Sequence, residues 1–495
     1  MKLILRFLLS LFAGLALGFG FDFLFLGASD RPLTDQLSLM VFSASAISYL
    51  TFTLLQSPRE LLNSFRWPKG AFGRDAISSL LREHLPGILL ALVFFTVYIN
   101  IGLRLNLPGI DTVDNFLDAD NSSWMMRIAA PEGYQLEMRG PHPFAYFILR
   151  PVGWITNLFT QNYALASILV NTFAGGLCVF FTWVFMKNQT ENRTYALLMA
   201  CLLGLSTAQI FFGSVIESYV FSAAVLVVYF VLLQSRQESK GSLVAAGLVT
   251  FGITLTNFVQ NLIGFIVSRP RLKEIIRFAG LTISAGIVLS LIHAAWYPSS
   301  KLFFLPSEVL GEDEFAVSIL GGPSWKALGR ITLLTRTILL YTIIAPRPYV
   351  FEAEVGGTFP RFNFFKIVPG TFSHSSYDGL GNVLVMAWAI LLLISAVVFL
   401  RDMARSRKTD LRLAFVLCIL FNFILHLNYG YEPFLYSPDW AYALIFLVGM
   451  SLAPFAKNRI FQGGMAIFLV LLAYNQFQFF QFVFQTIAPF VGQAY

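Results

Sequence analysis

Charged residues are scarce in this chain of 495 residues: 12% are Asp, Glu, Lys or Arg, while 57% are hydrophobic. A typical soluble domain carries about 25% charged residues. The mean hydropathy of +0.69 agrees with this imbalance. The composition therefore excludes a soluble globular protein and predicts an all-α membrane protein that crosses the bilayer many times.

Cysteine is also scarce, with Cys178, Cys201 and Cys418 as its only instances. Each lies inside an apolar run without the spacing of metal ligands, so we expect three buried core residues and no disulfide framework. The formal net charge is +7, but Lys and Arg concentrate in short loops between apolar runs, as cytoplasmic loops require. This pattern argues against a nucleic-acid partner.

Apolar windows of about 20 residues predict the membrane spans. The stretch 243–267 is ambiguous, because a single crossing would place the following Arg and Lys residues outside; we favour two short helices that turn at Thr256 and Asn257. The total is then about thirteen crossings, counted at the typical span length. The other expected spans are 4–26, 35–56, 85–103, 163–186, 195–212, 217–234, 278–297, 380–400, 411–428, 440–456 and 464–487.

The basic loop after the second span, with Arg59, Arg66 and Lys69 among its cations, predicts a cytoplasmic N-terminus. Three stretches then lie on the extracytoplasmic face, near 104–160, 298–379 and 429–439. Within the second of these, Trp325 to Ala345 is apolar but carries cations, which favours an amphipathic juxtamembrane helix. We divide the chain into residues 1–84, with two extra helices and a cytoplasmic loop, and a membrane domain over 85–495.

The first outer loop is unusually acidic, with six carboxylates between Asp111 and Arg150. Solvation explains many of them, since loops are generally polar. The alternative is that one acts as a general base. Asp114 shares a helical face with Asp111 and Asp118, whereas Asp120 directly precedes a predicted helix from Asn121, whose dipole would favour an ionised carboxylate. We therefore rank Asp120 first as the base, Asp118 second and Asp114 as a weaker site residue.

Several polar residues outside this loop are further candidates for substrate binding. Glu217 ends a predicted span, and ionisable groups at membrane depth usually face a cavity; a simple helix-end position is the equal alternative. Asn257 could cap a helix or contact substrate. His142, between two prolines, is interpreted as structural before metal-binding, because no second histidine stands at ligand spacing.

Outer-face cations are unusual, because positive charge is normally kept in the cytoplasm. Cations near the headgroups suit a phosphate, although some will only snorkel to lipid. The cations that map outside are Lys301, Arg330, Arg336, Arg347, Arg361 and Lys366. Glu432 and Tyr436 belong to a stiff aromatic loop on the same face, which could instead be a tight turn.

The order of these features resembles the GT-C glycosyltransferases, polytopic enzymes that include protein O-mannosyltransferases and the aminoarabinose transferases of lipid A. The similarity begins near Leu85 and is carried by GPHPFAYFILRPVGWI, AQIFFGSVIESYVFSAAVLVVYFVLL and GLVTFGITLTN. In that family the catalytic carboxylate lies in the first outer loop, which maps onto Asp118 or Asp120. The paired Asp-Glu of many members is missing here. Some members use a divalent cation such as Mg²⁺ or Mn²⁺ and others do not, so the resemblance leaves metal dependence open.

The resemblance implies a multi-pass enzyme of the cell (inner) membrane that takes a sugar from a polyprenyl-phosphate donor. A carboxylate would deprotonate the acceptor hydroxyl on the extracytoplasmic face, with inversion, while cations stabilise the departing phosphate. The acceptor would be a lipid, a glycan or a protein. The alternative is a transporter or flippase of lipid-linked saccharides, for which internal repeats and broken helices at mid-membrane are expected; the sequence shows neither, apart from the stretch 243–267.

Overall fold

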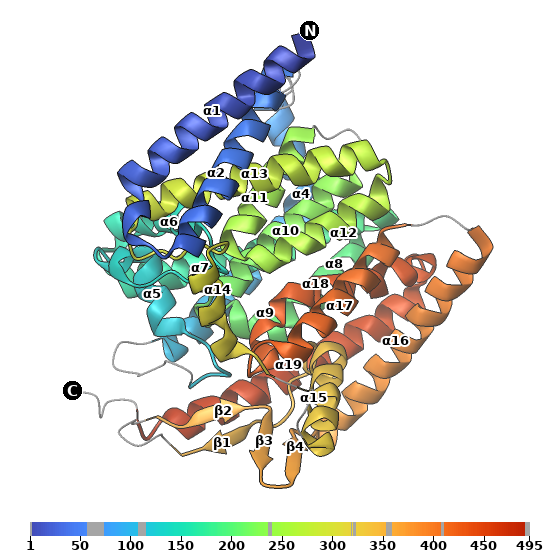
Figure 1. Ribbon diagram of the computed structural model, residues 1–495. Helices are drawn as coiled ribbons and strands as arrows, with labels where there is room; N and C mark the ends of the chain where they lie inside the picture. Colours follow the sequence, from blue (N-terminus) through green and yellow to red (C-terminus); the bar gives the residue numbers. More distant parts are fainter. Residues whose placement is uncertain are drawn as a thin grey trace. The chain divides into compact units, whose positions relative to one another are not determined.

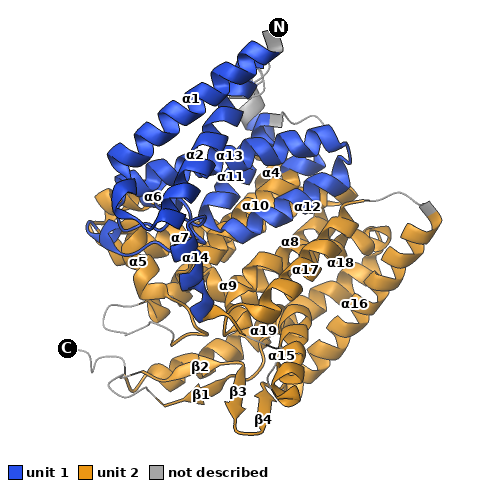
Figure 2. Ribbon diagram, viewed as in Figure 1, with its two compact units in different colours: residues 1–80, 131–152, 232–314 blue, residues 81–130, 153–231, 315–495 orange. Residues whose placement is uncertain are grey.

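The structure is a computed structural model that describes residues 2–56, 74–106, 115–235, 240–317, 319, 323–352, 359–406 and 410–490. Helices dominate it (Figure 1). The chain divides into two compact units (Figure 2): unit 1 comprises Met1–Leu80, Pro131–Val152 and Leu232–Glu314, and unit 2 comprises Leu81–Ala130, Gly153–Val231 and Phe315–Tyr495. The first 80 residues thus belong to a unit with two later segments of the chain.

The long apolar helices of the structure agree with the prediction of a helical membrane protein. Within the described residues, eight helices are long and apolar enough to cross a bilayer, and they are Ile4–Phe25, Leu33–Gln56, Ser78–Leu105, Tyr163–Thr190, Leu272–Trp296, Gly379–Arg405, Leu411–Asn428 and Arg459–Ile487. Shorter apolar helices are Arg193–Leu205, Ser218–Gln234, Gly241–Ile253 and Leu255–Ser268. The larger number of crossings stays a prediction.

Unit 1 is built on the N-terminal helix pair. Its elements are α1 (Lys2–Phe25), η1 (Ala28–Asp30), α2 (Leu33–Gln56), η2 (Gly133–Gln135), α11 (Lys240–Ile253), η3 (Leu255–Asn257), α12 (Phe258–Ser268), α13 (Leu272–Trp296) and α14 (Pro306–Leu310). The predicted interruption within 243–267 is present, because η3 separates α11 from α12. Gly247 of α11 faces Phe258 of α12 and Phe278 of α13, and a Cβ at this position would contact both rings. The small residue therefore allows the three helices to pack closely.

Unit 2 holds most of the other helices, and α4, α6, α10 and η4 contribute residues to both units. Its elements are α4 (Arg74–Leu105), α5 (Asn121–Ala129), α6 (Ala145–Thr160), α7 (Tyr163–Thr190), α8 (Arg193–Leu205), α9 (Thr207–Phe212), α10 (Ser218–Gln234), η4 (Gly311–Phe315), α15 (Ser324–Arg336), η5 (Thr337–Tyr341), α16 (Gly379–Ser406), α17 (Leu411–Asn428), η6 (Pro433–Tyr436), α18 (Pro438–Ser451), η7 (Ala453–Phe455) and α19 (Arg459–Ile487).

The predicted span 195–212 is two helices, α8 and α9, separated at Ser206. The Ser206 Oγ accepts a hydrogen bond from the Gln209 N–H at 3.3 Å and so caps α9. Serine favours this non-helical position, because its side chain replaces a missing backbone partner. The break matters because α9 ends shortly before Glu217, which lies in the non-helical link to α10.

The stretch 298–379, which was predicted to lie on the extracytoplasmic face, contains strands that the all-α prediction did not include. β1 (Tyr349–Phe351) pairs antiparallel with β2 (Arg361–Asn363), and β3 (Phe365–Val368) pairs with β4 (Thr371–His374). Aromatic and β-branched residues favour these strands, and Gly370 supplies the positive φ of +80° in the β3–β4 turn. The expected juxtamembrane helix is shorter than predicted: α15 ends at Arg336 and a π-helical turn, η5, follows.

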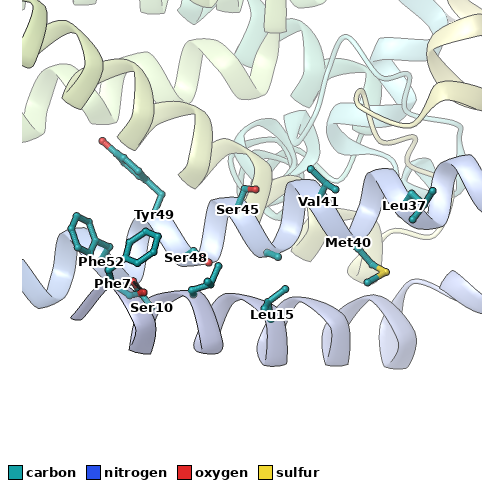
Figure 3. A pocket seen from close by; sticks show the side chains of 12 residues that line it. Phe7, Ser10, Leu15, Leu37, Met40, Val41, Ser45, Ser48, Tyr49 and Phe52 are labelled. Carbon is teal, nitrogen blue, oxygen red and sulfur yellow. Dashed lines mark hydrogen bonds between the residues drawn. The ribbon is translucent and has the colours of Figure 1, made fainter. Parts of the chain in front are cut away.

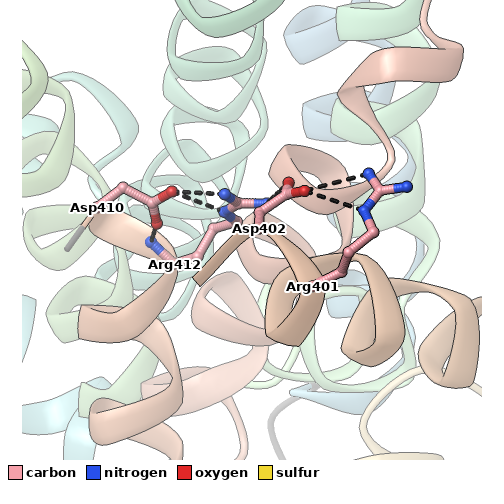
Figure 4. A network of polar contacts seen from close by, with 4 residues as sticks. All are labelled: Arg401, Asp402, Asp410 and Arg412. Carbon is pink, nitrogen blue, oxygen red and sulfur yellow. Dashed lines mark hydrogen bonds and ion pairs between the residues drawn. The ribbon is translucent and has the colours of Figure 1, made fainter. Parts of the chain in front are cut away.

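Charged residues tie the end of α16 to the start of α17 (Figure 4). Arg412 pairs with Asp402 at 3.0 Å and with Asp410 at 2.7 Å, and Arg401 pairs with Asp402 at 3.1 Å. Asp410 also caps α17 by accepting the Arg412 N–H at 2.8 Å. Partly exposed pairs of this kind contribute modestly to stability, so their main effect is to fix the connection between the two helices.

Candidate active site

Asp118, the second-ranked candidate for the base, lies in a strained turn of unit 2. The Ala119 N–H donates to the Phe116 carbonyl at 3.2 Å, which closes a four-residue turn. Both central residues have positive φ, +56° at Leu117 and +66° at Asp118. Asp tolerates this conformation, whereas for a bulky residue such as Leu it is unfavourable and needs support from its surroundings. Such strain gathers at functional sites, and here buried Leu117 anchors the turn while Asp118 stays half-buried.

Strand β2 supports this turn and supplies a cation to it. The Leu117 N–H donates to the Phe362 carbonyl at 3.0 Å, and the Phe362 N–H donates to the Asn115 carbonyl at 2.8 Å. The rings of Phe116 and Phe362 stack with centroids 5.8 Å apart. The neighbouring Arg361 Nη2 lies 3.7 Å from Asp118 Oδ1, with both side chains about a quarter exposed. Two predicted site residues, far apart in sequence, therefore form a long ion pair.

Asp120 lies at the start of α5, as predicted. Its side chain makes no capping hydrogen bond. Its backbone N–H instead donates to Glu217 Oε2 at 2.9 Å. A carboxylate side chain at this position lies near the positive end of the helix dipole, and it is half-buried. Asp120 is thus placed through its backbone, and the cap does not use its carboxylate.

Glu217 is 2% exposed, and it is the residue that accepts the Asp120 N–H. Its Oε1 accepts hydrogen bonds from the Ser218 N–H at 2.7 Å and the Ser218 hydroxyl at 3.1 Å. The Glu217 carboxyl group therefore accepts main-chain N–H groups at both of its oxygens, from Ser218 at Oε1 and from Asp120 at Oε2. Two adjacent carboxyl groups in unlike environments, one buried and one half-buried, have the arrangement of an acid and a base in many enzymes.

Three buried amides hold this pair in place, and none of them was predicted as a site residue from the sequence. Asn106 Nδ2 donates to the Ser214 carbonyl at 2.8 Å, and Asn121 Nδ2 donates to Asn106 Oδ1 at 3.1 Å. Asn171 Oδ1 accepts from the Glu217 N–H at 3.4 Å. Asn106 directly follows a membrane helix and Asn171 lies inside one, so an amide within or beside an apolar run was the available signal.

Glu432 lies in the loop before η6 and is 1% exposed. Its Oε1 accepts the Phe434 N–H at 3.0 Å. The Phe434 ring meets Phe364, which directly follows β2, with centroids 4.7 Å apart. Burial raises the pKa of Glu432 to about 8, with Asp118 adding to the rise and Arg330 opposing it. Glu432 therefore lies within electrostatic reach of the Asp118 turn.

Arg330, predicted to bind phosphate, is 4% exposed and makes hydrogen bonds to backbone carbonyls. It donates to His426 at 2.6 Å through Nη2 and to Tyr431 at 2.7 Å through Nη1, and Nη2 also contacts the carbonyls of Tyr429 and Gly430. This geometry gives Arg330 the role of a clamp, because it joins α15 to the end of α17 and the loop that carries Glu432. Tyr436 packs beside this loop, its ring stacked on His426 at 4.1 Å.

Two further predicted cations, Arg336 and Arg347, lie in unit 2 with different contacts. Arg336 Nη1 donates to the Tyr341 hydroxyl at 3.4 Å and to the Ser375 carbonyl at 3.3 Å. Arg347 is exposed, and its guanidinium lies 5.7 Å from the centre of the Phe482 ring. Two predicted cations are paired with carboxylates of the acidic loop: Arg361 with Asp118 at 3.7 Å in unit 2, and Lys301 with Glu137 at 2.7 Å in unit 1.

Two predicted residues belong to unit 1, and one lies outside the described residues. His142 Nδ1 lies 2.6 Å from the Ile253 carbonyl, and Asn257 Oδ1 accepts from Gln260 Nε2 at 2.8 Å. Asp114 falls in the part of the chain that the structure does not describe. The residues brought together in unit 2 are Asp118, Asp120, Glu217, Arg361 and Glu432, which we call the acidic site.

The acidic site could activate a hydroxyl group and neutralise an anion. Among the described residues, no three His, Cys, Asp or Glu side chains are grouped so that they could hold a metal ion. No family model matches the chain, and no curated protein matches it either. The similarity to the GT-C enzymes therefore rests on the sequence motifs alone.

Proposed function

We propose that this protein is a membrane glycosyltransferase that moves a sugar from a polyprenyl-phosphate donor to an acceptor hydroxyl, with inversion, on the extracytoplasmic face. The observation that carries the proposal is the pairing of half-buried Asp120 with buried Glu217 beside the strained Asp118 turn. Transfer from a lipid-linked donor also accounts for a catalytic loop set among apolar helices, since the carrier stays in the bilayer.

Asp120 is the proposed general base. A base must be ionised and within reach of the acceptor proton, and Asp120 is half-buried with no capping bond to its side chain. As the acceptor oxygen bonds to the sugar carbon, its proton passes to Asp120 and the bond from that carbon to the phosphate oxygen breaks. Glu217 positions Asp120 by accepting its backbone N–H, so Glu217 is a positioning residue.

Arg361 is the proposed partner of the departing phosphate. A guanidinium at the site of developing charge stabilises the transition state, and an Arg can bind phosphate in bidentate geometry. The pair with Asp118 is long, at 3.7 Å, and about a quarter of the Arg361 side chain is exposed. Asp118 then holds Arg361 in place and is the second candidate for the base.

The arrangement in the membrane is part of the proposal. The distribution of Lys and Arg supports a cytoplasmic N-terminus, about thirteen crossings and a GT-C-like membrane domain over 85–495. The inner membrane of the cell is the compartment where such a carrier would be used. The sugar could then reach a lipid, glycan or protein acceptor without crossing the bilayer.

The direct test offers the purified protein polyprenyl-phosphate sugars in lipid vesicles and measures free polyprenyl phosphate. Release that depends on an added acceptor, and that the Asp120→Asn variant lacks, is the expected result. Movement of the intact lipid-linked saccharide across the vesicle without release would overturn the proposal in favour of a flippase.

A further inference from the structure

A groove of about 670 Å³ runs between α1 and α2 in unit 1 (Figure 3). Its lining is almost entirely apolar and includes Phe7 and Leu15 from α1 and Met40, Tyr49 and Phe52 from α2. Its volume lies within the range of binding pockets for small molecules, roughly 300–1,000 Å³. The groove belongs to the two extra helices that precede the GT-C-like part of the sequence, and the acidic site does not involve it.

The groove is fixed by a tight seam beside it. Gly14 and Gly18 lie one turn apart on α1, and a Cβ on Gly14 would come 2.5 Å from the Ala44 carbonyl oxygen of α2. Small residues at this spacing let two membrane helices approach closely. At one end of the pair, the Ser43 hydroxyl donates to buried Asp22 at 2.7 Å. The helix pair is therefore held in one register, and the groove is a feature of that packing.

The surroundings of the groove indicate a hydrocarbon occupant. Both helices are apolar enough to span a membrane, and lining residues such as Leu15, Leu37 and Val41 are more than half exposed. In a bilayer these side chains face lipid and not water. The lining on α2 runs from Leu37 to Phe52, which corresponds to roughly 22 Å at the helical rise. One leaflet is roughly 15 Å deep in hydrocarbon, so the groove has room for the length of an acyl chain.

Charge differs between the two ends of the groove. Figure 3 shows Phe7, Tyr49 and Phe52 together at one end and Leu37 and Met40 toward the other. Arg6 directly precedes Phe7, and Arg277 of α13 interacts electrostatically with Tyr49.

Next to Leu37, by contrast, Asp35 accepts hydrogen bonds from Ser307. An anionic headgroup is complementary to the Tyr49 end only. On the predicted topology this end faces the cytoplasmic leaflet, where anionic lipids are enriched.

We propose that the α1–α2 groove binds one acyl chain of an anionic glycerophospholipid, with the lipid phosphate beside Arg277 and Arg6. The occupied groove would complete the surface of the N-terminal helix pair, whose packing otherwise leaves this side open. The site goes beyond the proposed glycosyl transfer, and its test uses lipid binding alone as the readout.

The test uses vesicles of phosphatidylethanolamine and phosphatidylglycerol that contain a phosphatidylglycerol with a photoactivatable acyl chain. The full-length protein is irradiated, and the labelled residues are found by mass spectrometry. Adducts should concentrate on groove residues such as Met40 and Tyr49, and unlabelled phosphatidylglycerol should compete better than phosphatidylcholine. Even labelling of the exposed apolar residues, with Leu17 and Leu24 as heavily marked as Met40, would overturn the proposal.

Two pairs of variants sharpen the result. Ser45→Phe fills the groove and should abolish the concentrated labelling, whereas Leu17→Phe adds an aromatic ring on α1 outside the groove and should leave it unchanged. Arg277→Gln should lower the preference for phosphatidylglycerol about five-fold, the effect of one cation near a charged membrane surface. Lys273→Gln, which removes an exposed cation one turn earlier, should not. An unchanged preference in Arg277→Gln would overturn the placement of the headgroup.

Discussion

The backbone N–H of Asp120 donates a hydrogen bond to the buried carboxyl group of Glu217 at 2.9 Å. This contact joins the acidic loop to the link between α9 and α10. It fixes the backbone of Asp120, the residue before α5, while the Asp120 side chain makes no capping hydrogen bond. The proposed base is thus held by its main chain, and its carboxylate can face an acceptor.

Glu217→Gln should reduce both stability and turnover. The Glu217 carboxyl group accepts hydrogen bonds at both oxygens, whereas the amide nitrogen of Gln would face either the Asp120 N–H or the Ser218 N–H as a second donor. An unsatisfied buried N–H costs about 1–3 kcal/mol. The midpoint of chemical denaturation and the rate of polyprenyl-phosphate release should both fall.

The matched control for this variant is Glu132→Gln, because Glu132 is an exposed acid of the same loop. It should change neither measurement. If Glu217→Gln keeps both the stability and the turnover of the wild type, the Asp120–Glu217 contact has no positioning role.

Glu432 should make the protein less stable as pH rises. The folded protein holds the Glu432 proton up to a pKa of about 8, whereas the unfolded chain releases it near the ordinary value of 4.5. Between these values the folded state binds more protons, so stability falls with increasing pH. Glu432→Gln, which can still accept the Phe434 N–H, should flatten this dependence.

The measurement is the midpoint of thermal unfolding between pH 5 and pH 9 for wild type and variant. The wild type should lose stability relative to Glu432→Gln as pH rises through this window. Parallel curves for the two proteins would show that Glu432 does not carry a raised pKa.

Arg361 and Arg330 should respond differently to replacement. Arg361→Gln should weaken donor binding by about 1.5–3 kcal/mol, the typical contribution of a hydrogen bond to a charged group, and leave the fold intact because the side chain is partly exposed. Arg330→Gln should instead destabilise the protein, since the buried carbonyls of residues 426–431 lose their donor. Donor titration and denaturation separate the two effects. Unchanged donor affinity in Arg361→Gln would remove this residue from the phosphate site.

The distribution of cations predicts the sidedness of the membrane domain. A tag near Lys408 should report the cytoplasm, and a tag near Gly133 should report the opposite side. Accessibility to a reagent that does not cross membranes is the measurement. A cytoplasmic tag near Gly133 would place the acidic loop on the wrong side for an extracytoplasmic donor.

Long apolar runs were the part of the fold that sequence could predict. The helices α1, α2, α13, α16 and α17 lie close to their expected ranges, because burial in lipid requires about 20 consecutive apolar residues. The break at Ser206 was missed because a single cap is a local feature that a long apolar window averages out. The strands at 349–374 were missed because each has only three or four residues.

The candidate site was predictable in its residue types and less so in its contacts. Asp120 was expected before a helix and lies there, but its pairing with Glu217 links residues 97 positions apart, which local patterns do not contain. The amides Asn106 and Asn171 were overlooked for the same reason. Arg330 was predicted to bind phosphate, but it donates to the carbonyls at the end of α17 and in the following loop. The sequence could not distinguish these two roles, because a cation that binds a ligand and one that binds carbonyls look the same in it.

The most direct test of the proposed mechanism compares Asp120→Asn with Asp118→Asn in the release of polyprenyl phosphate from a polyprenyl-phosphate sugar. Asn keeps the size of Asp and removes its basicity, so Asp120→Asn should bind donor normally and lower turnover by about 100-fold or more. Asp118→Asn should retain more activity, with weaker donor binding because Arg361 loses its partner. Full turnover in both variants would contradict the assignment of the acidic site as the catalytic centre.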